Sequence, residues 1–236
     1  MAKRWSNDVR VHFGGYDIGT ALTSVSVSQA VVALDPTALG DAAERQLAGI
    51  RQDMVEWAGI FDDSLSSDAA GAAMLGSGTN NVFQAHFGTA TGSLAYAGTV
   101  LMVSHKAVAS KSELVMAEGE FKADGKLYRG NTLLTKTTFT GSGSSEPADF
   151  GAISTGTSAL FIQIFSFAGA GSGSLFLQGA TTATGVYTSI ATLLGGTATK
   201  SYIALGTGTL NRWTRIIKTA TGTLEVAAVV VRDYTA

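Results

Sequence analysis

Short runs of alternating apolar and polar residues, separated by glycine-containing turns, constrain this chain more than any other feature. Successive side chains of a β-strand point to opposite faces of a sheet, so this alternation is typical of strands with one buried face. The clearest run is 54–61, where Val55, Trp57 and Phe61 share a face that we expect to be buried. Together with the 29 glycines, the pattern predicts a mainly β chain with many tight turns.

Strands are expected along most of the chain. The expected ranges are 9–13, 22–32, 54–61, 82–88, 94–105, 113–122 and 127–140 in the first half, and 160–167, 174–178, 187–191, 202–205, 213–218 and 224–232 in the second. The runs 9–13 and 22–32 are predicted to form a hairpin or to be neighbours. Hairpin turns are predicted at Asp124-Gly125 and in the glycine and serine cluster 169–174.

Two segments depart from the strand pattern. Pro36, Gly40 and Gly49 interrupt the stretch 33–52, which predicts a structured loop with one helical turn at 41–47. Loops of this length are usually functional or disordered, and the charge here favours function by contact. The single expected helix runs over 64–75, with a serine cap at its start and glycines after its end.

The domain organisation follows from a change in composition. Residues 1–137 hold 11 of the 16 Lys and Arg residues and 14 of the 18 Asp and Glu residues. The segment 138–158 is rich in glycine and serine and reads as a linker. We therefore expect a first domain over 1–137 and a C-terminal β-sandwich domain over 159–236.

Composition and motifs argue against several function classes. A net charge of −2 gives no basic groove for nucleic acid, and the absence of cysteine excludes disulfides and thiolate chemistry. His12, His86 and His105 lack metal-ligand spacing, so each is interpreted as a surface or sheet residue. We expect no enzyme, no cofactor, no metal site and no membrane insertion. The N-terminus has no apolar run typical of a secretory signal.

One cationic and aromatic cluster stands out in the charge-poor second half. Arg212-Trp213-Thr214-Arg215 places Trp213 and Arg215 on one strand face, which suits a cation–π pair or a contact with a polyanion. The favoured interpretation is a structural role on an edge strand.

The chain resembles the major tail tube proteins of long-tailed, siphovirus-like bacteriophages. The resemblance covers roughly residues 10–137 and rests on the order and spacing of several short sequence segments. These segments are Asp17-Ile18-Gly19-Thr20, Leu34-Asp35-Pro36-Thr37-Ala38-Leu39-Gly40-Asp41, Ala48-Gly49-Ile50-Arg51 and Trp57-Ala58-Gly59-Ile60-Phe61-Asp62, with Tyr128-Arg129-Gly130 as a weaker one.

The resemblance implies a β-sandwich or split barrel flanked by one short helix. It also implies homo-oligomeric rings, usually hexamers, that stack into a tube in the virion tail after assembly in the host cytoplasm. The implied partners are further copies of the chain, other tail proteins (tape measure, tail terminator and tail tip), and double-stranded DNA that passes without tight binding. Inter-subunit contacts or their support are then assigned to Asp35, Asp41, Glu44, Arg45, Arg51 and Trp57.

The second half departs from the minimal tube protein. It resembles the extra β-sandwich domains that some tail proteins display, for which passive structure, either as a decoration or as a second tube-like fold, is favoured over glycan binding. Three alternative functions of the whole chain are considered. They are a surface adhesin or carbohydrate-binding module, another virion component such as a head–tail connector or decoration protein, and a β-sandwich hydrolase.

Overall fold

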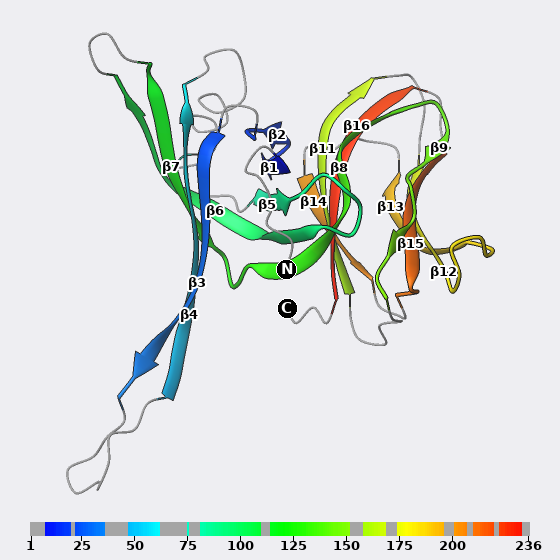
Figure 1. Cartoon of the computed structure of the whole chain (residues 1–236), viewed down its shortest axis with the longest axis horizontal. Helices are drawn as coiled ribbons and strands as arrows, with labels where there is room; N and C mark the ends of the chain where they lie inside the picture. The colour runs from blue at the N-terminus through cyan, green and yellow to red at the C-terminus, as the bar shows by residue number, and fades with distance from the viewer. Residues whose placement is uncertain are drawn as a thin grey trace, which may run out of the picture. The chain divides into compact units, whose positions relative to one another are not determined.

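The computed structural model describes residues 8–19, 22–35, 47–61, 75, 81–109, 114–151, 158–168, 174–195, 201–206, 210–219 and 222–232. These ranges form antiparallel sheets that are not closed into a barrel (Figure 1). The fold is a mainly β sandwich, as the alternation predicted. The expected helix 64–75 lies outside the described residues except for Leu75, which is in a turn.

Each predicted strand range overlaps a strand of the structure, although three strands of two residues each were not predicted. The first half contains β1 (Val9–Phe13), β2 (Tyr16–Asp17), β3 (Leu22–Leu34), β4 (Leu47–Ile60), β5 (Asn81–Phe87), β6 (Leu94–Val108), β7 (Met116–Ala123) and β8 (Tyr128–Thr140). The second half contains β9 (Gly143–Ser144), β10 (Ala148–Asp149), β11 (Ser158–Ala168), β12 (Ser174–Ala180), β13 (Thr188–Gly195), β14 (Ser201–Gly206), β15 (Trp213–Thr219) and β16 (Thr223–Val231).

The chain divides into two compact units. Unit 1 comprises Met1–Thr20, Asn81–Gly98 and Tyr128–Ala236, and unit 2 comprises Ala21–Asn80 and Thr99–Leu127. This division does not follow the expected one into 1–137, 138–158 and 159–236. The reason is strand pairing: β8 runs past residue 137 along β16, and β9 and β10, inside the expected linker, pair with β15.

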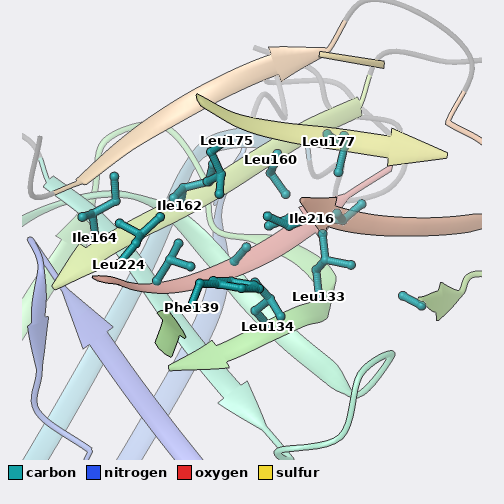
Figure 2. Packing of buried hydrophobic residues seen from close by; sticks show 14 of the residues in the cluster. Leu133, Leu134, Phe139, Leu160, Ile162, Ile164, Leu175, Leu177, Ile216 and Leu224 are labelled. Atoms are coloured by element: carbon teal, nitrogen blue, oxygen red, sulfur yellow. The ribbon is translucent and has the colours of Figure 1, made fainter. Parts of the chain in front are cut away.

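Unit 1 is a sandwich with a continuous apolar core (Figure 2). One sheet has the order β14-β11-β16-β8-β6-β5-β1-β2, and the other has the order β10-β15-β12-β13 with β9 also paired to β15. Leu160 and Ile162 of β11 face Leu175 of β12 and Ile216 of β15, all buried. Burial of alternate side chains from both sheets explains why these strands read as apolar alternation in the sequence.

Unit 2 is a four-stranded antiparallel sheet with the order β3-β4-β7-β6. Its buried face includes Val55, Trp57, Met102 and Phe121, so the predicted Val55 and Trp57 face is confirmed, whereas Phe61 is only half-buried. Trp57 lies opposite Gly119 in the ladder. A Cβ added at Gly119 would stand 2.5 Å from Nε1 of Trp57, so glycine is what makes room for the indole.

The expected long loop over 33–52 is corrected to a long hairpin (Figure 1). β3 continues to Leu34 and β4 begins at Leu47, with Ala33 opposite Ala48 and Val31 opposite Arg51. Gly49 therefore lies inside a strand, at the point where the register shifts between Val31 and Ala33, and glycine is typical of such irregularities in a strand. Residues 36–46, with most of the expected helical turn, lie outside the described residues.

Three predicted pairings are wrong. β1 forms its hairpin with β2 and pairs with β5, whereas β3 pairs with β4. The Asp124-Gly125 turn joins no hairpin, because β7 pairs with the end of β6 and β8 with its beginning. The cluster 169–174 connects two sheets, since β11 pairs with β14 and β16 while β12 pairs with β13 and β15. Local turn signals do not determine which strand a chain will join.

Candidate functional site

A polar groove crosses the solvent-facing side of the unit 2 sheet. Strand alternation places small hydroxyl groups from β3 beside charged groups from β4, β6 and β7 on this face. The groove has a volume of about 440 Å³, and its main polar residues are Ser24, Ser26, Glu56, Lys106, Glu118 and Glu120. The buried face of the same sheet holds Trp57, so the groove rests on a packed apolar layer.

Carboxylates are concentrated in this groove at some cost to the sheet. Glu56 lies directly opposite Glu120 in the ladder, and like charges in such cross-strand pairs are destabilising. Glu118 lies opposite Lys106, and Nζ of Lys122 approaches Glu120 at 3.9 Å. The lysines offset the repulsion only in part, since three carboxylates face two ammonium groups. A solvated, weakly acidic surface is the result.

β3 forms an open edge of this sheet. Within the described residues it pairs with β4 alone, so the other side of a 13-residue strand presents backbone N–H and C=O groups. Long open edges invite pairing with another chain. The part of this hairpin near the ends of β3 and β4 that adjoin residues 36–46 exposes four large apolar side chains that would be costly to leave in water. They are Val31 (50% exposed), Val32 (40%), Leu47 (59%) and Ile50 (77%).

A buried carboxylate clamps the chain at Leu127. Oδ2 of Asp53, whose side chain is fully buried, accepts a hydrogen bond from the backbone N–H of Leu127 at 2.7 Å. Nε of Arg51 donates to both oxygens of Asp53 at 2.9 and 2.8 Å. Nε2 of Gln29, opposite Asp53 in the ladder, donates to the Leu127 carbonyl at 2.6 Å. Both backbone polar groups of Leu127 are thus satisfied by side chains from β3 and β4.

The residues assigned to inter-subunit contacts have different surroundings. Asp35 is exposed just after β3, Arg51 holds Asp53, and Trp57 is buried in the sheet core. Asp41, Glu44 and Arg45 lie outside the described residues. The assignment of these six residues to contacts or their support remains a prediction.

Sequence reasoning missed Asp53 and Ile50. Asp53 occupies the same strand face as Val55 and Trp57, so an acid in an otherwise apolar alternation was the signal for a buried partner. Ile50 was assigned to a loop, which concealed that it is a strongly exposed apolar residue of a strand.

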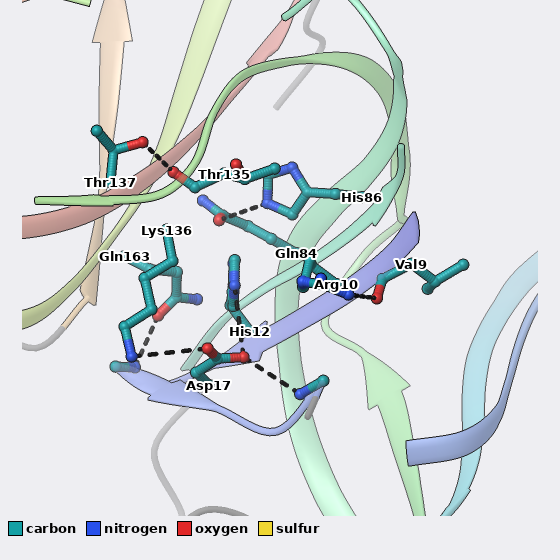
Figure 3. A network of polar contacts seen from close by, with 12 residues as sticks. Val9, Arg10, His12, Asp17, Gln84, His86, Thr135, Lys136, Thr137 and Gln163 are labelled. Atoms are coloured by element: carbon teal, nitrogen blue, oxygen red, sulfur yellow. Dashed lines mark hydrogen bonds and ion pairs between the residues drawn. The ribbon is translucent and has the colours of Figure 1, made fainter. Parts of the chain in front are cut away.

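A second polar cluster is buried inside unit 1 (Figure 3). Nε2 of Gln84 donates to the Phe161 carbonyl at 2.8 Å, and Oε1 of Gln84 lies 3.2 Å from Nε2 of His86. Nδ1 of His86 lies 3.0 Å from the Thr132 hydroxyl. Because Oε1 can only accept, the proton of neutral His86 resides on Nε2, and Nδ1 accepts from Thr132. This chain of bonds joins β5, β8 and β11.

The histidines of this cluster are held in the neutral form. His12 packs edge-on against His86 and Phe165, with ring centroids 5.0 and 4.9 Å apart. Burial lowers the pKa of His12 from 6.5 to about 3, opposed by Gln84 and reinforced by the charges of Lys136 and Arg10. Burial, and then the neighbouring His12, lower the pKa of His86 well below its ordinary value. Their interpretation as sheet residues is confirmed, but neither is on the surface.

Comparison with solved structures finds several chains of low sequence identity that resemble this one. A chain of the virion of the native gene transfer agent particle is 18% identical, with a TM-score of 0.45 over 53% of this chain and 97% of that one. A chain of the empty gene transfer agent tail, of C6 symmetry, is 20% identical, with a TM-score of 0.44 over 53% and 97%. These similar chains come from virion and tail particles. The SPP1 Dit protein, described as a paradigm of hub adsorption apparatus in phages that infect Gram-positive hosts, is 11% identical, with a TM-score of 0.36 over 94% and 98%.

No family model and no curated protein matches the sequence. Within the described ranges, no group of three or more His, Asp or Glu residues is arranged to hold a metal ion. The same ranges contain no helix long and apolar enough to cross a membrane.

Proposed function

We propose that this chain is a structural subunit of a phage tail that assembles as stacked homo-oligomeric rings, forming a tube for genome delivery. The open edge of β3, next to the exposed apolar residues of the β3–β4 hairpin, is the observation that carries the proposal. The sequence resemblance to major tail tube proteins supports the same assignment. In this role the chain is a structural subunit, and its function depends on specific contacts between copies.

The unpaired backbone groups of the β3 edge favour ring formation. A strand of the next subunit pairs with β3, and its backbone groups satisfy those that β3 leaves open. Closed rotational symmetry then pairs the β3 edge of every subunit in the ring. Val31, Val32, Leu47 and Ile50 lose their exposure against the neighbouring subunit, which supplies the apolar contact that edge pairing alone lacks. Six copies per ring is the proposed number.

The polar groove is proposed to face the channel. Glu56, Glu118 and Glu120 repel the phosphates of passing DNA, so the conduit does not grip its cargo. This role accounts for a Glu56–Glu120 pair that weakens the isolated sheet. The tape measure, tail terminator and tail tip proteins are the proposed further partners at the ends of the tube.

Replacing Ile50 with lysine is expected to prevent ring formation without unfolding the subunit. Ile50 is 77% exposed, so the fold does not need its side chain, whereas an interface would have to bury the new charge. Val186→Lys is the matched control, because Val186 is 87% exposed and belongs to unit 1. Light scattering and electron microscopy would show Val186→Lys assembling like wild type. Normal rings from Ile50→Lys would contradict the proposed interface.

Replacing Glu56 with lysine is expected to make assembled tubes bind double-stranded DNA at low salt. The substitution relieves the repulsion with Glu120, so the sheet should tolerate it, and every subunit contributes one reversed charge. We expect at least tenfold tighter binding than wild type in a sedimentation assay, falling steeply with added salt. Glu146→Lys makes the same charge change at an exposed position of unit 1. Equal DNA binding by the two variants would show that the groove does not face the channel.

A further inference from the structure

The second sheet of unit 1 has an outer face with an unusual composition. β15 is not an edge strand as expected, because it pairs with β12 on one side and with β9 and β10 on the other. Its alternate residues Thr214, Ile216 and Lys218 are buried. The intervening residues Trp213, Arg215 and Ile217 are half-buried on the outer face, as are Phe176 and Gln178 of β12. Aromatic and planar polar groups therefore share one surface.

Arg215 is held rigidly on this face. Its Nε donates to Oε1 of Gln178 at 3.1 Å, and its Cζ lies 4.1 Å from the ring centroid of Tyr187. These two contacts orient the plane of the guanidinium and leave the two Nη groups for another acceptor. Among the described residues, no carboxylate forms an ion pair with Arg215. Within the described part of the chain, the guanidinium is therefore an oriented cation that no carboxylate compensates.

The neighbouring charge is already neutralised. Arg212 donates two hydrogen bonds of 2.8 Å to Asp149, which lower the pKa of that carboxyl to about 2. The Cζ of Arg212 lies 5.6 Å from the ring centroid of Trp213. Trp213 stands two residues from Arg215 on the same strand face, about 6.6 Å along the strand. An aromatic surface and an available guanidinium fork are thus side by side.

We propose that Trp213, Arg215, Gln178 and Tyr187 form a binding site for an acidic polysaccharide that contains hexuronate. The sugar carboxylate accepts two hydrogen bonds from the Nη groups of Arg215, a geometry that the planar fork favours. The apolar C–H face of the pyranose ring stacks on Trp213. Charge complementarity selects this ligand over a neutral glycan, because no carboxylate among the described residues pairs with Arg215. The site is independent of the β3 edge and of the groove.

The test compares galacturonate oligomers with their methyl esters, using the full-length chain and isothermal titration calorimetry. The ester removes the negative charge of the carboxyl group and adds one methyl group to it. We expect the acid to bind at least tenfold more tightly than the ester. Dextran sulfate serves as a polyanion without carboxylates, and a short DNA duplex serves as a nucleic acid. Equal affinity for the ester, or tighter binding of either control polyanion, would overturn the proposal, as would no binding of the acid.

Variants locate the site. Arg215→Gln is expected to weaken galacturonate binding at least tenfold, while Arg129→Gln, which removes the same charge at an exposed position of β8, should leave it unchanged. Trp213→Ala should weaken both probes, provided that its thermal unfolding remains cooperative. The acid-to-ester comparison in wild type needs no variant, so it decides the question even if Trp213→Ala does not fold. Equal effects of Arg215→Gln and Arg129→Gln would place any binding elsewhere.

Discussion

Replacing Asp53 with alanine is expected to lower the free energy of unfolding by about 3 kcal/mol. The substitution removes the acceptor of the buried Leu127 N–H and the partner of Arg51. An unsatisfied buried donor carries its full desolvation cost. Because the Arg51 side chain is 38% exposed, water compensates it, which keeps the loss at the lower end for a broken buried pair. Urea denaturation of the monomeric chain measures the effect.

Two further variants separate the contributions of the clamp. Asp53→Asn keeps an oxygen that accepts from Leu127 but loses the charge, so we expect about half the loss of Asp53→Ala. Arg51→Ala leaves the buried carboxylate with fewer donors and should destabilise the monomer before any assembly. Ring failure from Arg51→Ala at unchanged monomer stability would instead favour the direct inter-subunit contact that the resemblance to tail tube proteins implies. A wild-type-like midpoint for Asp53→Ala would refute the clamp.

Acid is expected to destabilise the protein well before its carboxylates are all protonated. The pKa of His12 is about 3 in the folded chain and near 6.5 when unfolded, so the unfolded chain binds more protons between these values. Stability from neutral His12 is complete above pH 6.5 and is lost progressively as the pH falls towards 3. The loss from this residue alone is about 2 kcal/mol at pH 5. His86, with its pKa also lowered, adds to it.

The surroundings of His12 suggest a control variant for this pH dependence. Its Nε2 lies 3.7 Å from Oδ1 of Asp17, and Nζ of Lys136 lies 3.6 Å from Oδ2 of the same carboxylate. His12→Phe keeps a ring between His86 and Phe165 and removes the titrating group. Its free energy of unfolding should fall less steeply with acid than that of wild type, whatever its value at neutral pH. Parallel slopes between pH 7 and 4.5 would show that His12 is not kept neutral by the fold.

The sequence predicted the strands better than their partners. Alternation identified β4, β12 and β15 because one face of each is buried, a property of the local pattern. The Asp124-Gly125 turn and the 169–174 cluster were read as hairpins because a turn signal carries no information on distant strands. At Asp124-Gly125 the hairpin does not form because β7 and β8 both pair with β6, through contacts that are non-local in sequence.

The residues that meet in the candidate site were likewise not predictable from local sequence patterns. The alternation of Glu56 with Val55 and Trp57 indicates that the unit 2 sheet has one polar face. Its meeting with Glu118 and Glu120 depends on the register of β4 against β7. The burial of His12 and Gln84 required packing on both faces of their strands, which alternation within one strand does not indicate.

The central claim is that the open edge of β3 assembles copies of this chain into rings and tubes. Electron microscopy of the purified protein across a concentration series tests it most directly. The proposed function predicts rings, and at higher concentration hollow tubes of constant diameter, with sixfold symmetry in end views. Monodisperse monomers at every concentration, including after addition of preformed tail tips as initiators, would contradict it.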